Sequence, residues 1–119
     1  MIGCGSFARN QLHARRAIAG VQILALCDRD AGRLAETAAR FGIARTYANA
    51  DALPVDGGLD VVDVAPTVAA HRPLVEAAAA TSLHAICQKP FAERAVIRAR
   101  GDSSFHSLCH AIWMPVPSR

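Results

Sequence analysis

Two glycines and an alanine near the start of the chain have the spacing of a phosphate-binding turn. Residues 3–8 read Gly-Cys-Gly-Ser-Phe-Ala, the pattern G-x-G-x-x-A. In such a turn the first glycine permits a tight bend, and the second lets the backbone approach a pyrophosphate. The small third residue lets the following helix pack closely on a strand, and the positive end of the helix dipole faces the anion. The pattern indicates a dinucleotide site.

An acidic residue stands at the distance that such a site requires. Asp28 follows the apolar run 21–27 and lies 20 residues after Ala8. A carboxylate about 20 residues beyond the turn hydrogen-bonds the ribose 2′-hydroxyl of NAD. Arg29 could accept the 2′-phosphate of NADP or stack on adenine, and it could equally be a solvated surface residue. We expect NAD or NADP as cofactor, with NAD favoured by Asp28. An ordinary glycine-rich turn, with Asp28 at a helix entry, is the alternative.

The only lysine of the chain follows the last predicted strand. Lys89 stands between Gln88 and Pro90. In an open α/β sheet, ligands bind beyond the carboxyl ends of the strands. A lysine there can give a hydrogen bond or a proton to an alcohol or carbonyl oxygen. From the residues alone, Lys89 is a candidate catalytic group or a surface lysine beside a strand-ending proline.

Short apolar runs and periodic segments alternate along the chain. Buried parallel strands are predicted over residues 21–27, 43–47, 60–65 and 83–87. Helices are predicted over residues 7–19, 31–41 and 70–80. Ser6 and Asp30 are the expected N-caps of the first two helices, and Gly20 and Gly42 their expected ends. This alternation predicts an α/β domain with a parallel sheet.

Four motifs, in this order, resemble the N-terminal half of the Gfo/Idh/MocA family of NAD(P)-dependent sugar and inositol oxidoreductases. They are the glycine turn, Asp28, the strand 61–65 with the residues after it, and the strand that ends in Lys89-Pro90. The resemblance runs from Ile2 to about Glu93. It implies a Rossmann-like doubly wound parallel sheet. It also implies that the chain is the NAD(P)-binding part of an enzyme acting on the CH–OH group of a sugar, inositol or related polyol.

The resemblance also assigns roles to individual residues. Lys89 would position or protonate the reacting hydroxyl, and Pro66, Thr67 and His71 would line the nicotinamide side. Gln88 replaces the usual glutamate of the family and could keep a hydrogen bond to the nicotinamide ribose. The whole predicted cofactor-binding set is Gly3, Gly5, Ser6, Phe7, Ala8, Asp28, Arg29, Pro66, Thr67, His71, Gln88 and Pro90.

The chain departs from the family pattern at both ends of this region. Only Met1 and Ile2 precede the glycine turn, so we expect an incomplete sheet whose first strand is largely missing and whose neighbouring strand edges are unpaired. Nothing resembles the family's second domain, which supplies the substrate pocket. A non-catalytic fragment or degraded gene product, with weak or no nucleotide binding, is therefore the alternative to an enzyme part.

The composition changes near residue 93. Residues 1–93 contain nine basic and nine acidic side chains, whereas residues 94–119 contain four arginines and one aspartate. We expect a dinucleotide-binding domain over 1–93. Residues 94–119 are expected to be a divergent tail, translated out of frame and poorly ordered. Because the net charge of +3 arises in this tail, it does not indicate a nucleic-acid-binding face.

The remaining composition is that of a globular cytoplasmic protein. Apolar residues make up 52% of the 119 residues and charged residues 19%. No apolar run approaches the roughly 18 residues of a membrane span, and no signal peptide is visible. Four cysteines in mostly apolar surroundings indicate reduced thiols. The His and Cys spacings at 84–87 and 106–110 match no zinc pattern, so no metal is expected. The sequence does not indicate an oligomeric state.

Overall fold

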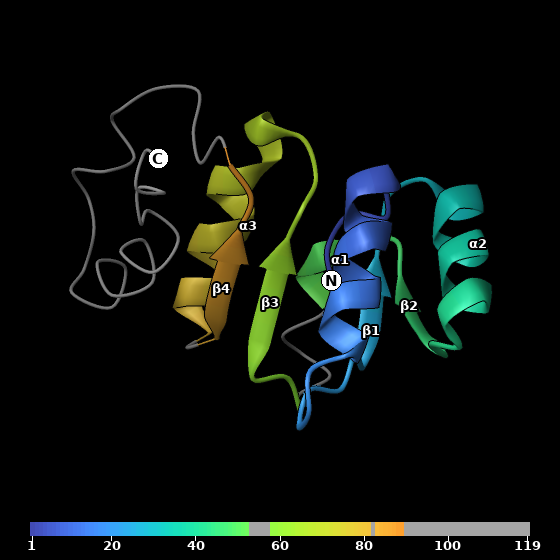
Figure 1. The fold of residues 1–119 in the computed structure, drawn as a ribbon. Helices are drawn as coiled ribbons and strands as arrows, with labels where there is room; N and C mark the ends of the chain where they lie inside the picture. The colour runs from blue at the N-terminus through green and yellow to red at the C-terminus, as the bar shows by residue number, and fades with distance from the viewer. Residues whose placement is uncertain (53–57, 82, 90–119) are drawn as a thin grey trace, which may run out of the picture.

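The structure, a computed structural model, describes residues 1–52, 58–81 and 83–89. Its elements, in chain order, are α1 (Ser6–Arg16), β1 (Ala25–Cys27), α2 (Ala31–Phe41), β2 (Arg45–Tyr47), the 3₁₀ turn η1 (Ala50–Ala52), β3 (Val61–Val64), α3 (Val68–Ala80) and β4 (His84–Cys87). Strand β1 pairs in parallel with β2, and β3 pairs in parallel with β4 (Figure 1). The predicted α/β fold with parallel strands is confirmed.

The first three residues join the two strand pairs into one sheet. Ile2 forms a parallel bridge to Cys27 of β1 and another to Val64 of β3. The N–H of Ile2 donates to the Asp63 carbonyl at 2.8 Å, and the N–H of Gly3 donates to the Cys27 carbonyl at 2.8 Å. The order across the sheet is β2, β1, residues 1–3, β3, β4. The segment 1–3 thus pairs the facing strand edges, but only toward their carboxyl ends.

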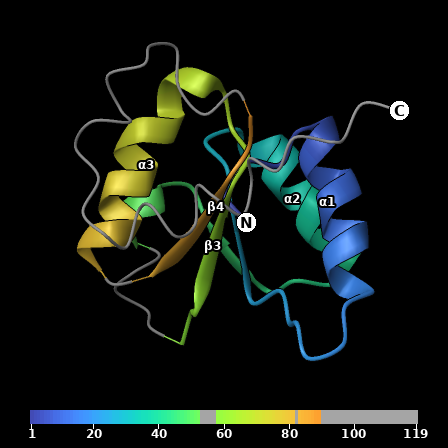
Figure 2. The ribbon, with the colours of Figure 1, turned by 60° about the vertical axis from the view of Figure 1, so that its left-hand side comes forward.

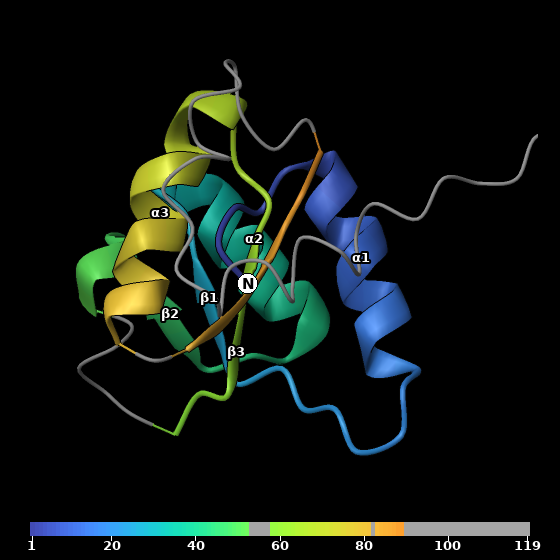
Figure 3. The ribbon, with the colours of Figure 1, turned by 90° about the vertical axis from the view of Figure 1, so that its left-hand side faces the viewer.

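Helices cover both faces of the sheet (Figures 2 and 3). Helix α3 lies on one face, and α1 and α2 lie on the other. Because successive side chains of a strand point to opposite faces, Leu26 of β1 serves one core and its neighbours Ala25 and Cys27 serve the other. The core under α1 and α2 contains Cys4, Leu12, Leu26, Leu34 and Phe41. The core under α3 contains Ile2, Ala25, Cys27, Val62, Val64, Val75 and Cys87.

One charged pair is built into the face that α1 covers. The carboxylate of Asp63 is almost fully buried, its Oδ2 accepts a hydrogen bond from Nε of Arg15 at 3.1 Å, and Nη2 of Arg15 lies 3.1 Å from the same oxygen in an ion pair. A buried carboxylate is costly unless a cation and hydrogen bonds compensate it. The pair therefore attaches α1 to β3, two elements that lie far apart in the sequence.

Helix α2 begins and ends at the cap residues that the sequence predicts, and α1 does not. The Asp30 side chain accepts the Arg33 N–H at 2.9 Å, and Gly42 adopts a left-handed φ of +67°, so the predicted cap and end of α2 are confirmed. The predicted cap of α1 was wrong. Gly5 is the N-cap, Ser6 is already helical, and no side chain caps the helix, which ends at Arg16 rather than residue 19.

Strand β1 is also shorter than the predicted 21–27. Its inner neighbour, the segment 1–3, extends back only as far as Ala25, whose carbonyl accepts a hydrogen bond from the Met1 ammonium at 3.1 Å. A strand needs a paired partner to satisfy its backbone groups, so residues 21–24 do not continue it. The predicted tail 94–119 lies outside the described residues.

Candidate functional site

The predicted site residues gather at one edge of the sheet. The glycine turn follows the segment 1–3, Asp28 follows β1, Pro66 follows β3, and Gln88 follows β4. Because all paired strands run in parallel, their carboxyl ends meet at the same edge. After residues 1–3 the chain forms β1 and β2 on one side of this segment. It then crosses over and forms β3 and β4 on the other side. The edge therefore contains the topological switch point where such sheets bind ligands.

Two loops touch at this switch point. Gly3 has a left-handed φ of +92°, and a Cβ placed on it would lie 2.9 Å from the Ala65 carbonyl carbon and 2.9 Å from the Pro66 nitrogen. Only glycine fits both the backbone angle and the close approach. The glycine turn and the loop after β3 are therefore held side by side.

Asp28 is held against the glycine turn. Its Oδ2 accepts the N–H of Cys4 at 2.8 Å, and its Oδ1 accepts the N–H of Asp30 at 2.8 Å. Arg33 places Nη1 at 4.0 Å from Oδ2. The predicted acidic residue and the predicted turn are thus brought together by a direct hydrogen bond. Arg29, the next residue, is exposed at the same edge.

The start of α1 is open to an anion. Gly5 has nothing within 4 Å of an added Cβ, and no acidic side chain lies in the first turn of the helix. Ser6 and Phe7 are exposed, whereas Ala8 is buried beneath them, where its small side chain allows close packing. The first N–H groups of a helix have no partner within the helix. With the positive end of the helix dipole, they fit a phosphate group.

The residues after β3 form a supported loop. His71 is 2% exposed, and its Nε2–H donates to the Pro66 carbonyl at 3.1 Å. Its Nδ1 has no hydrogen-bond partner among the described residues. The imidazole therefore lies beneath Pro66 and braces the loop that touches Gly3. Thr67 is exposed at the N-cap position of α3, where its side chain makes no capping hydrogen bond.

The residues after β4 reach the same edge. The N–H of Gln88 donates to the Val64 carbonyl at 3.0 Å, which aligns it with the end of β3. The side chain of Gln88 is half-buried, and Lys89 is exposed. Pro90 lies outside the described residues. The geometry thus places Lys89 at the carboxyl edge of the sheet.

The thiol of Cys4, within the glycine turn, is unreactive. Cys4 is fully buried. Burial, followed by the nearby Asp28 carboxylate, raises the pKa of its thiol to about 11. Burial also raises the pKa of the Cys27 thiol. Both cysteines are free thiols in the part of the chain that the structure describes. A protonated thiol is a poor nucleophile, so Cys4 serves packing rather than catalysis.

Sequence reasoning missed the contacts that tie this edge together. The approach of Gly3 to Ala65 and the pairing of Arg15 with Asp63 join residues that are distant in the sequence. Asp63 did carry a signal, because it interrupts an otherwise apolar strand and must face a compensating group. No group of three or more metal-ligating side chains occurs in the part of the chain that the structure describes. Within the same residues, the helices are too short or too polar to cross a bilayer.

Comparisons with known proteins agree on one family. Residues 1–99 match the Gfo/Idh/MocA family, described as an oxidoreductase family with an NAD-binding Rossmann fold. D-apiose dehydrogenase of Rhizobium rhizogenes is 48% identical over 115 residues, covering 92% of this chain and 33% of that protein. The chain therefore spans about a third of the length of this relative.

Solved structures give the same result. A crystal structure of an oxidoreductase from Agrobacterium radiobacter, in complex with NAD+, L-tartaric acid and magnesium, is 48% identical with a TM-score of 0.79. The match covers 91% of this chain and 32% of that one. The myo-inositol dehydrogenase of Lactobacillus casei, in complex with NAD(H) and myo-inositol, is 26% identical with a TM-score of 0.72, covering 76% of this chain and 27% of that one.

Substituting Gly3 tests the close contact at the switch point. We expect Gly3→Ala to lower the free energy of unfolding by about 1–3 kcal/mol. The alanine backbone is strained at a positive φ, and its Cβ would clash with the backbone of Ala65. Urea unfolding measures the change. Gly20→Ala is the matched control, since Gly20 also has a positive φ, +79°, but open space around an added Cβ. Equal losses in both variants would contradict the contact.

Alkylation of Cys4 tests its raised pKa. At pH 8 a thiol with a pKa of about 11 is ionised in roughly one molecule in a thousand. We therefore expect iodoacetamide to modify Cys4 very slowly in the folded chain and at an ordinary rate in urea. Because the protonated form dominates below the raised pKa, the rate in the folded chain should rise about tenfold per pH unit toward pH 11. Peptide mass spectrometry follows Cys4 separately. Rapid modification of the folded chain at pH 8 would refute the assignment.

Proposed function

Since this chain belongs to the Gfo/Idh/MocA family of oxidoreductases with an NAD-binding Rossmann fold, we propose that residues 1–93 hold NAD or NADP at the carboxyl edge of the sheet. The observation that carries the proposal is the hydrogen bond from the Cys4 N–H to Asp28. It places the acidic residue directly beside the glycine turn. The uncapped start of α1 and the open space around Gly5 fit a pyrophosphate.

Each part of the cofactor has a proposed partner. N–H groups at Gly5, Ser6, Phe7 and Ala8 would bind the pyrophosphate, with Gly3 forming the bend. Asp28 would accept a hydrogen bond from the ribose 2′-hydroxyl, and its negative charge would repel a 2′-phosphate, which favours NAD. Arg29 would contact adenine or, in NADP, the phosphate. The nicotinamide end would lie along Pro66, Thr67, Gln88 and Pro90, with His71 supporting Pro66.

For a protein as long as these relatives, the proposed reaction is oxidation of a CH–OH group in a sugar, inositol or related polyol. Nicotinamide, when bound, supplies the hydride chemistry. Lys89 would hydrogen-bond the substrate oxygen from its exposed position at this edge; its neutral amine would take up the hydroxyl proton on oxidation, and its ammonium would return that proton on reduction. Gln88 would position the nicotinamide ribose through a neutral hydrogen bond. The reduced thiols of Cys4 and Cys27 favour a reducing compartment such as the cytoplasm.

A nucleotide-binding module without catalysis is the second candidate. It is favoured by the length of the chain, which spans about a third of D-apiose dehydrogenase of Rhizobium rhizogenes. In that case the edge would bind the cofactor, and Lys89 would meet no substrate. Cofactor binding and turnover therefore need separate measurements.

Titration with NADH and NADPH tests cofactor binding. We expect saturable NADH binding, followed by nucleotide fluorescence. In Asp28→Ala it should weaken about 10- to 100-fold, as the loss of a charge-assisted hydrogen bond predicts. Asp28→Asn should narrow the preference for NADH over NADPH, because it removes the charge that repels the 2′-phosphate. Asp60→Asn, an exposed position before β3 at the opposite edge, is the control and should bind as the parent does. A folded parent chain that binds neither nucleotide would refute the proposal.

Turnover assays test the role of Lys89. With NAD+ and D-apiose or myo-inositol, NADH absorbance reports oxidation. If the chain is an enzyme, Lys89→Met should reduce kcat about 100-fold or more, as expected for a lost general acid–base group, with NADH affinity unchanged. Arg72→Met, on the exposed side of α3, is the control. NADH binding without turnover in the parent chain would favour the binding module and contradict catalysis by Lys89.

A further inference from the structure

Basic side chains gather where α1 and α2 pack side by side. The two helices meet at two points along their length. Nη2 of Arg9 lies 3.0 Å from Oε2 of Glu36, and the rings of His13 and Phe41 have centroids 4.8 Å apart. Residues three, four or seven apart lie along one side of a helix. We call the surface formed by these two facing sides the α1–α2 basic face, and its residues are Arg9, His13, Arg16, Arg33, Glu36 and Arg40.

Two arginines of this face have no carboxylate partner among the described residues. Arg9 and Arg33 each form an ion pair, whereas Arg16 and Arg40 form none there. The guanidinium of Arg16 lies over the ring of Phe41, 5.8 Å from its centroid, and Arg40 is exposed. Both arginines stand in the last turn of their helix. The basic face therefore has an excess of positive charge at the end that lies away from the carboxyl edge of the sheet.

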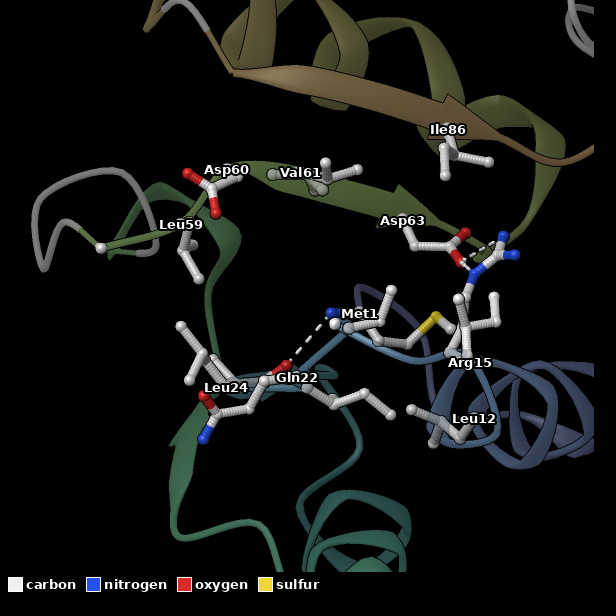
Figure 4. A pocket seen from close by; sticks show the side chains of 17 residues that line it. Met1, Leu12, Arg15, Gln22, Leu24, Leu59, Asp60, Val61, Asp63 and Ile86 are labelled. Atoms are coloured by element: carbon white, nitrogen blue, oxygen red, sulfur yellow. Dashed lines mark hydrogen bonds and ion pairs between the residues drawn. The ribbon is translucent and has the colours of Figure 1, made fainter.

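Arg15 shows how the fold itself uses an arginine of α1. It lies on the side of α1 that faces the sheet, in the wall of a pocket between β1 and β3, and pairs with the buried Asp63 (Figure 4). Its charge is thus compensated inside the molecule. Arg16 and Arg40 are exposed and have no such carboxylate. A ligand that brings carboxylates to the basic face would compensate them in the same way.

Glu36 distinguishes between the kinds of anion that the face could bind. Its side chain is 64% exposed, and it lies between Arg33 and Arg40 along α2. A continuous phosphate backbone would pass close to this carboxylate and be repelled by it, whereas a peptide with separate carboxylates can avoid it. Helices that lie on a membrane surface present large apolar side chains beside their basic residues. The large apolar side chain under this face, Phe41, is buried. An acidic peptide therefore fits the face better than a nucleic acid or a membrane.

The spacing of the arginines indicates the conformation of the peptide. Arg9 and Arg16 are seven residues apart, as are Arg33 and Arg40, which corresponds to about 10.5 Å along a helix axis. A partner helix aligned with α1 and α2 reproduces this spacing when it has carboxylates at i, i+3, i+7 and i+10, all on one side. Each guanidinium can then hold a carboxylate through two parallel N–H groups.

We propose that the α1–α2 basic face binds an acidic helix of another protein, which lies along α1 and α2 with carboxylates against Arg16 and Arg40. A second copy of this chain does not offer such a helix among its described residues, because α1 has no acidic side chain and α2 and α3 have one each. Arg16 and Arg40 lie away from the proposed cofactor site. NADH binding can therefore fail while helix binding succeeds, and the reverse.

Two peptides of equal composition test the proposal. Both are alanine- and glutamine-based helices of about 15 residues with four glutamates. The first has the glutamates on one side, at i, i+3, i+7 and i+10, and the second has them on two opposite sides, at i, i+2, i+7 and i+9. By fluorescence anisotropy, the first should bind saturably and the second about tenfold more weakly. No binding of the first peptide, equal binding of both, or tighter binding of a single-stranded RNA or of phosphatidylserine vesicles would overturn the proposal.

Variants of the chain locate the binding site. Arg40→Gln should weaken binding of the first peptide about threefold, and Arg16→Gln combined with Arg40→Gln about tenfold, as expected for exposed ion pairs. Arg72→Gln, which removes one exposed charge from α3 on the other face of the sheet, is the matched control and should bind as the parent does. Glu36→Gln should tighten binding about threefold, because it removes the charge that repels the peptide. Urea unfolding verifies that each variant is folded. Equal effects of Arg40→Gln and Arg72→Gln, or weaker binding by Glu36→Gln, would overturn the proposal.

Discussion

The hydrogen bonds of residues 1–3 are the constraint on which the rest of the structure depends. Ile2 contacts β1 and β3 at once, and without it the two strand pairs would share no backbone ladder. The same short segment sets the position of the glycine turn, because the N–H of Gly3 donates to the Cys27 carbonyl and its Cα lies in close contact with the Ala65 backbone. The placement of the candidate site and the continuity of the sheet therefore depend on the same few bonds.

The contacts of the two aspartates, Asp28 and Asp63, serve different purposes. At the carboxyl edge, Asp28 accepts two backbone N–H groups and shapes the turn, while the start of α1 remains open to an anion. On the face of the sheet that α1 covers, the Asp63 carboxylate is paired with Arg15 and holds α1 against the sheet. Removing one partner of such a buried pair costs more than the pair itself contributes, because the remaining charge stays desolvated. Helix α1 is thus oriented by a contact near its last turn and presents its first turn to the proposed ligand.

Local signals in the sequence predicted much of this arrangement. The cap and end of α2, the order of strands and helices, and the glycine turn with Asp28 all depend on residues that lie near one another or at a known spacing. The end of α1 and the short β1 were not predictable in this way, because they depend on which strand edges find a partner. The Arg15–Asp63 pair and the bracing of Pro66 by His71 arise only in the folded chain. The binding and catalytic roles of the site residues, from the glycine turn to Lys89, stay predictions.

The bridge from Ile2 to Val64 also has a consequence for how the chain folds. The central ladder of the sheet joins the first residues to residues that leave the ribosome much later. Contacts between residues so far apart in sequence are slow to form, because a long loop must close before they stabilise anything. The half containing α1, β1, α2 and β2 can assemble from shorter-range contacts. The sheet is completed only when β3 arrives, so newly made chains expose an unpaired β1 edge during synthesis.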